Sequence, residues 1–153
     1  PLSLLLMLVI LATLIITYLR LDIGRARVGR GERLLVHVPF SVYLGWITVA
    51  TIANVTSLLD YLGWGGWGIA PEVWAVIMLV AGTVIASAVS ITRGDIAYVL
   101  VIVWAFAGIA VKHSGTPLVS VTAGLMAVVV ALTLLIGVPR RRHRLRGPSA
   151  APA

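Results

Sequence analysis

The chain has 153 residues, of which 60% are hydrophobic and only 11% charged, whereas ordinary globular proteins are about 45–50% apolar and about 25% charged. With a mean hydropathy of +1.07, this composition excludes a soluble enzyme and a disordered chain, and indicates a protein integral to a membrane. The net charge of +7 comes from arginines clustered at the ends of apolar runs, which favours anionic lipids over nucleic acid as partners.

Apolar runs of about twenty residues follow one another along the chain and predict membrane-spanning helices. Helices are expected because the runs are continuously apolar, and because every backbone amide in hydrocarbon must be hydrogen-bonded within its own segment. The predicted fold class is therefore all-α, a polytopic transmembrane helical bundle. Its five predicted spans are 2–19, 38–59, 71–91, 96–111 and 117–138.

Arginine placement predicts the orientation, because positive residues in short loops stay on the cytoplasmic side. Arginines fill the loop between the first two spans, the loop after the third span and the segment after the fifth, whereas Lys112 lies alone on the opposite side. We therefore expect Pro1 outside and Ala153 in the cytoplasm of a bacterial-type cell (inner) membrane. The basic segment 139–153 is expected to form a disordered cytoplasmic tail.

Catalytic and metal-binding chemistry is not expected, because the spans contain no ionisable residue away from their ends. The chain has no cysteine, which excludes a disulfide and a thiolate metal site. His37, His113 and His143 fall in three separate loops or span boundaries, without a partner at ligand spacing. The prediction is a protein that is not an enzyme and has no metal site.

A polar and aromatic stripe marks the second span. Helical spacing of three and four places Tyr43, Trp46, Ala50 and Asn54 on one face. An amide facing lipid is costly, so Asn54 is expected to point into the bundle, where it hydrogen-bonds a neighbouring helix or lines a pocket. Trp46 and Tyr43 would stack on a flat aromatic ligand, with Ala50 leaving room for it. The same residues are also typical of plain helix packing, and both interpretations stay open.

Small residues at four-residue spacing predict close helix packing, within the chain or between copies. They occur in the third span at Gly82, Ala86 and Ser90, and in the fifth span at Ala123, Ala127 and Ala131, with Ser120 and Gly124 alongside.

The segment VYLGWITVATIAN, residues 42–54, resembles the last-helix signature of the TspO/MBR family, the tryptophan-rich sensory proteins or translocator proteins. That signature is approximately Pro-Tyr-Leu-x-Trp-x-x-x-Ala-x-x-x-Asn. The residues that match it in register are Tyr43, Leu44, Trp46, Ala50 and Asn54. Val42 stands where the family usually has proline, and Val55 stands where an aromatic residue often follows the asparagine. With its flanking sequence, the resemblance covers approximately residues 1–59.

The resemblance implies a five-helix membrane protein that binds porphyrins and other flat hydrophobic ligands, with Trp46 and Ala50 near the pocket. The family's Trp- and Pro-rich second helix is not recognisable before the signature. We therefore expect residues 1–59 to close a TspO-like bundle as the C-terminal part of an extended member, with three family helices upstream of Pro1. Residues 60–138 would then form an appended three-helix membrane unit.

Together these features predict an integral membrane binder or sensor, a receptor for a hydrophobic ligand with tetrapyrroles (porphyrins) as candidates. No resident cofactor is expected, and porphyrin or haem would be bound as a ligand. The expected partners are the lipid bilayer, anionic lipids at the arginine clusters, a hydrophobic small molecule and a second copy of the chain. Two alternatives stay open: a fragment of a membrane transporter or permease, and a structural membrane subunit.

Overall fold

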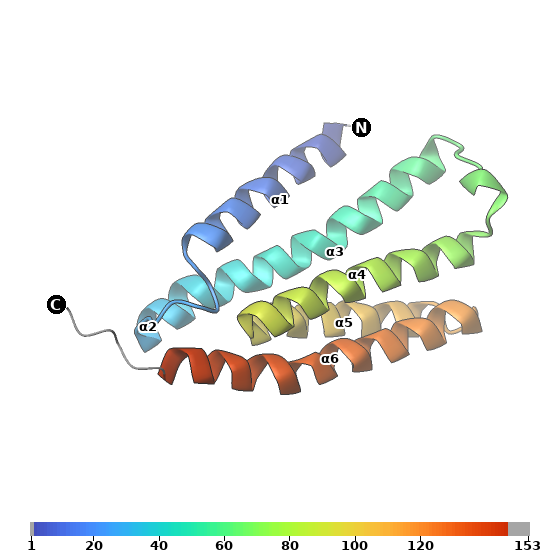
Figure 1. Cartoon of the computed structure of the whole chain (residues 1–153). Coiled ribbons are helices and arrows are strands. Elements are labelled where there is room, and N and C mark those ends of the chain that lie inside the picture. The colour runs from blue at the N-terminus through green and yellow to red at the C-terminus, as the bar shows by residue number, and fades with distance from the viewer. Residues whose placement is uncertain (1, 147–153) are drawn as a thin grey trace.

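The computed structural model describes residues 2–146 of the chain, and the side chains of residues 2–141. These residues form a bundle of long helices (Figure 1). The long helices are α1 (Leu2–Arg20), α3 (Val38–Tyr61), α4 (Pro71–Arg93), α5 (Ile96–Lys112) and α6 (Pro117–Arg146). The predicted all-α fold class is confirmed, and each long helix begins at the first residue of a predicted span. Three short elements join them, namely α2 (Arg30–Glu32), the π-helical turn η1 (Arg33–His37) and the 3-10 turn η2 (Gly66–Gly68).

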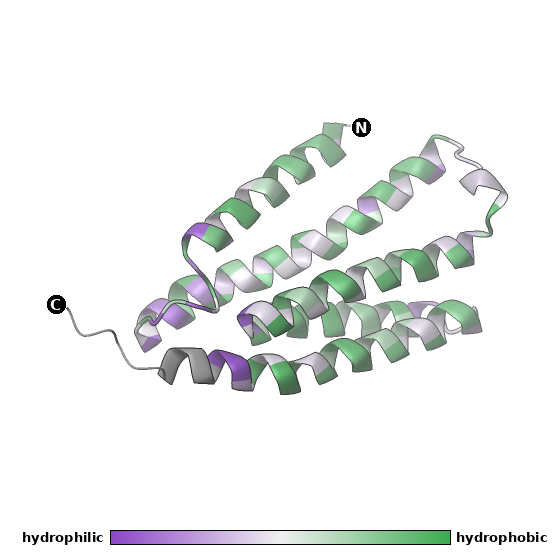
Figure 2. Cartoon of the chain, viewed as in Figure 1, coloured by the Kyte–Doolittle hydropathy of each residue, from purple (hydrophilic) through white to green (hydrophobic). Residues whose placement is uncertain are grey.

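Four of the helical stretches are long enough and apolar enough to cross a membrane. They are α1, the stretch Arg30–Tyr61, α4 and Pro117–Arg141. The fifth helix, α5, is also apolar but has 17 residues. Figure 2 shows hydrophobic residues along the lengths of the helices and hydrophilic ones gathered where α1 ends and α2 begins. Many large apolar side chains on α1, α4 and α6 are exposed, as expected for surfaces that face lipid. The chain is an integral membrane protein.

The tight connection between α4 and α5 follows from two adjacent residues. Gly94 ends α4 in the left-handed conformation (φ 60°, ψ 37°), which glycine adopts without steric cost. Asp95 then caps α5, because its carboxylate accepts a hydrogen bond from the backbone N–H of Tyr98 at 3.3 Å. The two residues reverse the chain at the end of the bundle that carries the arginines.

The helices pack in a definite order. Helix α6 lies against both α4 and α5, α3 lies against α5 and α1, and α1 packs mainly on α3 (Figure 1). Helix α5 is central, and Tyr98, Val99 and Ile102 are almost fully buried in the core. The small-residue faces are buried as predicted at Gly82, Ala86 and Ser90 of α4, and at Ala123 and Ala127 of α6.

About two further helical turns, which the sequence did not predict, precede α3. Residues 30–37, which the sequence places in an arginine-rich loop, are helical through α2 and η1 and continue directly into α3. Apolar periodicity misses this segment because charged residues, Arg30, Glu32 and Arg33, interrupt it. The π-helical turn widens the backbone just before the span, a distortion that is frequent at functional sites.

The last helix also extends further than predicted. The expected disordered tail begins at residue 139, but α6 is helical through Arg146 with Pro139 inside it. Arg141 packs on the α4–α5 turn, since a Cβ on Gly94 would lie 2.8 Å from the Cβ of Arg141. This contact, and the favourable position of cations near a helix C-terminus, explain why residues 139–146 are helical. Residues 147–153 of the predicted tail lie outside the described residues.

Candidate functional site

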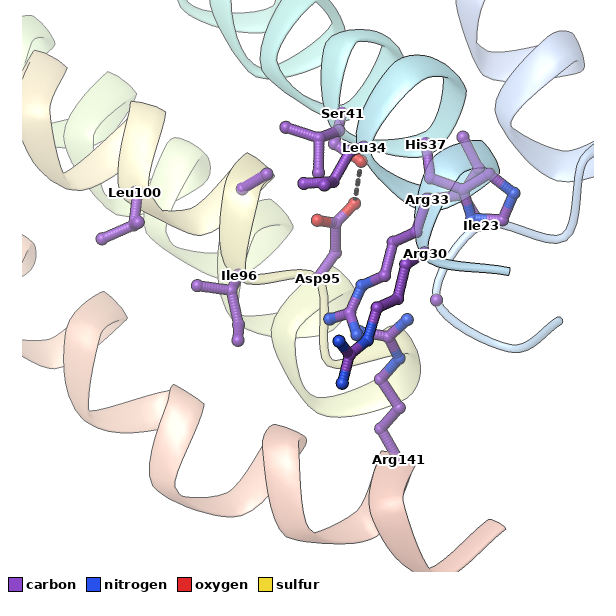
Figure 3. A pocket seen from close by; sticks show the side chains of 13 residues that line it. Ile23, Arg30, Arg33, Leu34, His37, Ser41, Asp95, Ile96, Leu100 and Arg141 are labelled. Carbon is purple, nitrogen blue, oxygen red and sulfur yellow. Dashed lines mark hydrogen bonds between the residues drawn. The ribbon is translucent and has the colours of Figure 1, made fainter. Parts of the chain in front are cut away.

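A cavity of about 430 Å³ opens at the arginine-bearing end of the bundle (Figure 3). Its walls come from the loop after α1, the stretch α2–η1–α3, the start of α5 and the end of α6. The volume lies in the range of small-molecule sites, roughly 300–1,000 Å³. The lining residues are Ile23, Gly24, Arg30, Arg33, Leu34, His37, Val38, Ser41, Asp95, Ile96, Ala97, Leu100 and Arg141.

One part of the lining is apolar. Leu34 and Val38 contribute from the η1–α3 stretch, and Ile96, Ala97 and Leu100 contribute from the first turns of α5. Ile96 is 37% exposed and Leu100 is 56% exposed, so this wall also forms part of the outer surface of the bundle. The apolar part of the lining thus continues onto the exposed surface of α5.

The other part of the lining is strongly basic. Arg30 and Arg33 are three residues apart on the α2–η1 stretch, and Arg141 comes from α6. Figure 3 shows the three guanidinium groups close together, below Asp95 in that view. The sequence predicts only that these arginines lie at the membrane surface, because their positions along the chain do not show which of them meet in space.

A buried carboxylate joins three helices beside the cavity. Asp95, 6% exposed, accepts hydrogen bonds from the Tyr18 hydroxyl of α1 at 2.7 Å and from the Ser41 hydroxyl of α3 at 2.5 Å. It also accepts the backbone N–H of Tyr98 on α5. Hydrogen bonds to an ionised group are stronger than neutral ones, so this network holds the arginine-bearing end of the bundle together.

The sequence patterns did not single out Asp95, which lies between the third and fourth predicted spans. The available signal was local: an acidic residue after glycine and directly before an apolar run is typical of a helix N-cap. Its burial and its bonds to Tyr18 and Ser41 depend on the packing of α1 and α3, which no local pattern contains.

Arg93 ties the loop after α1 to the end of α4. Its guanidinium donates a hydrogen bond to the carbonyl oxygen of Ile23 at 2.9 Å and lies 3.5 Å from the Asp22 carboxylate. It also lies over the Tyr18 ring, 5.1 Å from the ring centroid, a cation–π arrangement. Arg93 is therefore already paired, whereas Arg30, Arg33 and Arg141 form no ion pair with the residues that the structure describes.

Two of the predicted site residues lie on the outer surface of α3. Tyr43 and Trp46 are each 47% exposed. The Trp46 ring packs against Trp104 of α5, with ring centroids 5.3 Å apart and planes tilted by 37°. Neither residue, nor Ala50, lines the cavity. The Trp46–Trp104 pair lies one helical turn beyond Val42 and Leu100, so an exposed apolar surface connects it to the cavity wall.

The fourth predicted residue, Asn54, lies nearer the other end of α3. There it lines a smaller cavity of about 310 Å³ together with Ser3 and Leu4 of α1. Its amide donates a long hydrogen bond of 3.5 Å to the carbonyl oxygen of Ala50. The structure thus places Asn54 between helices, as its polarity predicts, and separates it from the basic cavity.

Metal ligands do not gather in the part of the chain that the structure describes, where no group of three or more His, Asp or Glu side chains lies together. His37 lines the cavity, His113 lies at the opposite end of α5, and the side chain of His143 lies outside the described residues. The site's chemistry is therefore the combination of an apolar wall and a cluster of cations, suited to binding.

Comparison with known proteins gives one match. The model of a family described as TSPO-like protein matches residues 1–136, which include α1, α3, α4, α5 and most of α6. The match thus extends beyond the segment 1–59 that carries the signature into the three helices expected to be appended. No curated protein and no solved structure matches the chain.

Proposed function

The chain belongs to the TSPO-like protein family, and on this premise we propose that it binds and senses a hydrophobic ligand, with porphyrins as the first candidates. The single observation that carries the proposal is the cavity of about 430 Å³ at the arginine-bearing end. It is large enough for a small molecule, and its apolar wall is open to the bilayer at Ile96 and Leu100.

The residues of the α3 stripe have a role at the entrance to this cavity in the proposal. Trp46 and Trp104 present an exposed aromatic surface on which a flat ligand stacks as it enters from the lipid. Tyr43 extends that surface, and the small side chain of Ala50 leaves room for the ligand beside it. Asn54 acts at a distance, by fixing the packing of α3 against α1.

Sensing is proposed to work through selection of one arrangement of the bundle, without chemistry on the ligand. The element best placed to move is α1, because it packs mainly on α3 and is joined to the rest through Tyr18 and the loop that Arg93 holds. The same loop contributes Ile23 and Gly24 to the cavity lining. A ligand in the cavity would therefore favour one position of α1 over others.

The test is a porphyrin titration of the protein in lipid nanodiscs, followed by tryptophan quenching. We expect saturable binding that Ala97→Phe, which fills the cavity, weakens about tenfold or more, since about 1.4 kcal/mol of lost binding free energy is tenfold. Trp46→Phe and Ala50→Phe are expected to weaken it less, because these residues lie at the entrance.

The matched control is Val128→Phe on the exposed surface of α6, outside the cavity lining, which should leave the affinity unchanged. Quenching that rises linearly with porphyrin and is equal in all variants would show partitioning into lipid, and would refute the proposed function.

A further inference from the structure

We infer that the cluster formed by Arg30, Arg33 and Arg141 is a receptor for an oxyanion, a carboxylate or phosphate group. The inference rests on the proposed function in one respect, since it assigns the ligand to the class of anionic amphiphiles. The apolar body of such a molecule would lie against Ile96, Ala97 and Leu100, and its anionic group would contact the three guanidinium groups.

The cavity lining carries an excess of positive charge. Three arginines face one carboxylate, that of Asp95, and its oxygens already accept hydrogen bonds from Tyr18, Ser41 and the N–H of Tyr98. Arg33 is close enough to Arg141 for the two positive charges to act on one another. Like charges gathered in a partly enclosed site at a membrane boundary repel, and a bound anion would remove that repulsion.

Among the described residues these three cations form no hydrogen bond or ion pair, although Asp95 is near enough to act electrostatically on Arg141, and Arg30 and Arg33 are exposed. Arg93 close by, in contrast, is fully engaged. The Nε of Arg141 is buried and unbonded. A guanidinium has five N–H donors in a planar fork that matches the geometry of carboxylate and phosphate.

The same lining contains a buried histidine whose ring has no hydrogen-bond partner among the described residues. This residue, His37, is 3% exposed. Buried polar atoms are nearly always hydrogen-bonded in proteins, so the ring nitrogens of His37 are available to a group that binds in the cavity. The histidine is a polar group independent of the arginines, and it supports the same site.

The experiment compares a porphyrin that has free propionate groups with its methyl ester, in nanodiscs of phosphatidylcholine. The wild-type chain should bind the free acid about tenfold more tightly than the ester, because charge-assisted hydrogen bonds are lost in the ester. The double variant Arg33→Gln/Arg141→Gln should reduce this ratio to about one, whereas the control Arg25→Gln, an exposed arginine outside the cavity lining, should preserve it.

A second arm tests the anion itself, independently of any porphyrin. Phosphatidylglycerol in the nanodisc, or inorganic phosphate in the buffer, should raise the melting temperature of the wild type and not that of Arg33→Gln/Arg141→Gln. Stabilisation by the lipid alone would identify a headgroup as the source of the oxyanion, and stabilisation by free phosphate would identify a soluble anion. Without added anion, the double variant should be at least as stable as the wild type, because repulsion is removed.

The outcomes separate the two proposals. The free acid and the methyl ester could bind saturably with equal affinity, and Ala97→Phe could abolish the binding of both. That result would retain the proposed function and overturn the oxyanion site. Loss of all saturable porphyrin binding, with arginine-dependent stabilisation by phosphate or phosphatidylglycerol, would overturn the proposed function and retain the oxyanion site. No anion-dependent stabilisation and no preference for the free acid would overturn the oxyanion site.

Discussion

At the scale of single residues, Asp95 shows how one buried carboxylate organises the arginine-bearing end of the bundle. It caps α5 with one oxygen, and with the other it accepts the hydroxyl hydrogens of Tyr18 and Ser41. A carboxylate at this depth is stable only while those donors surround it, because an unsatisfied buried charge is costly. Its loss would leave both hydroxyls without their acceptor.

Asp95→Ala is therefore expected to lower the free energy of unfolding by about 3 kcal/mol, a sum of lost charged hydrogen bonds at roughly 1.5–3 kcal/mol each with some compensation by water. The measurement is a detergent-denaturation titration of the purified protein. Asp60→Ala is the matched control, because Asp60 is exposed at the end of α3 and should change stability by less than about 0.5 kcal/mol. Equal midpoints for both variants would contradict the structural role of Asp95.

At the scale of the helices, the close approach of α4 and α6 depends on residues with small side chains. A Cβ placed on Gly137 would overlap the backbone carbonyl oxygen of Ser90, which is itself fully buried. Gly124, which the sequence groups with the packing face of the same helix, has open space at its Cβ position. Spacing alone identifies the approximate face, and only the helix crossing shows which glycine lies at the contact.

Gly137→Ala is expected to destabilise the bundle by about 1–3 kcal/mol, the usual cost of overpacking a tight contact, because α4 and α6 must move apart. Gly124→Ala adds the same methyl group to the same helix and should leave stability unchanged or slightly raised. Thermal unfolding of the two variants in one detergent gives the comparison. If Gly137→Ala and Gly124→Ala destabilised the protein equally, the loss of stability would come from a general intolerance of α6 to alanine and not from the contact with Ser90.

At the scale of the whole molecule, the distribution of charge and exposed apolar surface determines how the bundle lies in a membrane. Most of the basic residues lie at one end of the bundle, where α1 and α4 terminate and α2 and η1 precede α3. Figure 2 shows hydrophilic residues at that end. Around the middle of the bundle the exposed side chains are large and apolar. The positive-inside rule then predicts that the basic cavity faces the cytoplasm.

Single-cysteine labelling checks this orientation cleanly, because the chain has no cysteine of its own. Gly29→Cys lies at the basic end, and Ser114→Cys lies in the exposed turn between α5 and α6. In intact bacterial cells a membrane-impermeant maleimide should label Ser114→Cys, and should label Gly29→Cys only after lysis. The reverse pattern would invert the predicted topology and place the cavity outside.

The sequence by itself determined the five apolar helices, their first residues and the all-α class, because an apolar run in hydrocarbon pairs its own backbone groups by forming a helix. It also determined the family signature on α3 and the gathering of arginines at one end of the bundle, since both depend only on the spacing of residues along the chain. The division of the chain at residue 59 and the ligand role of Tyr43, Trp46, Ala50 and Asn54 stay predictions.

Only the tertiary structure decided which residues share a site. Arg33 and Arg141 lie far apart along the chain and meet because the α2–η1 stretch and α6 both extend beyond the spans. Asp95 is buried because α1 and α3 bring Tyr18 and Ser41 to it. Local patterns record which surface of a helix is apolar, but convergence of polar side chains depends on how helices cross, and that is set by packing over the whole bundle.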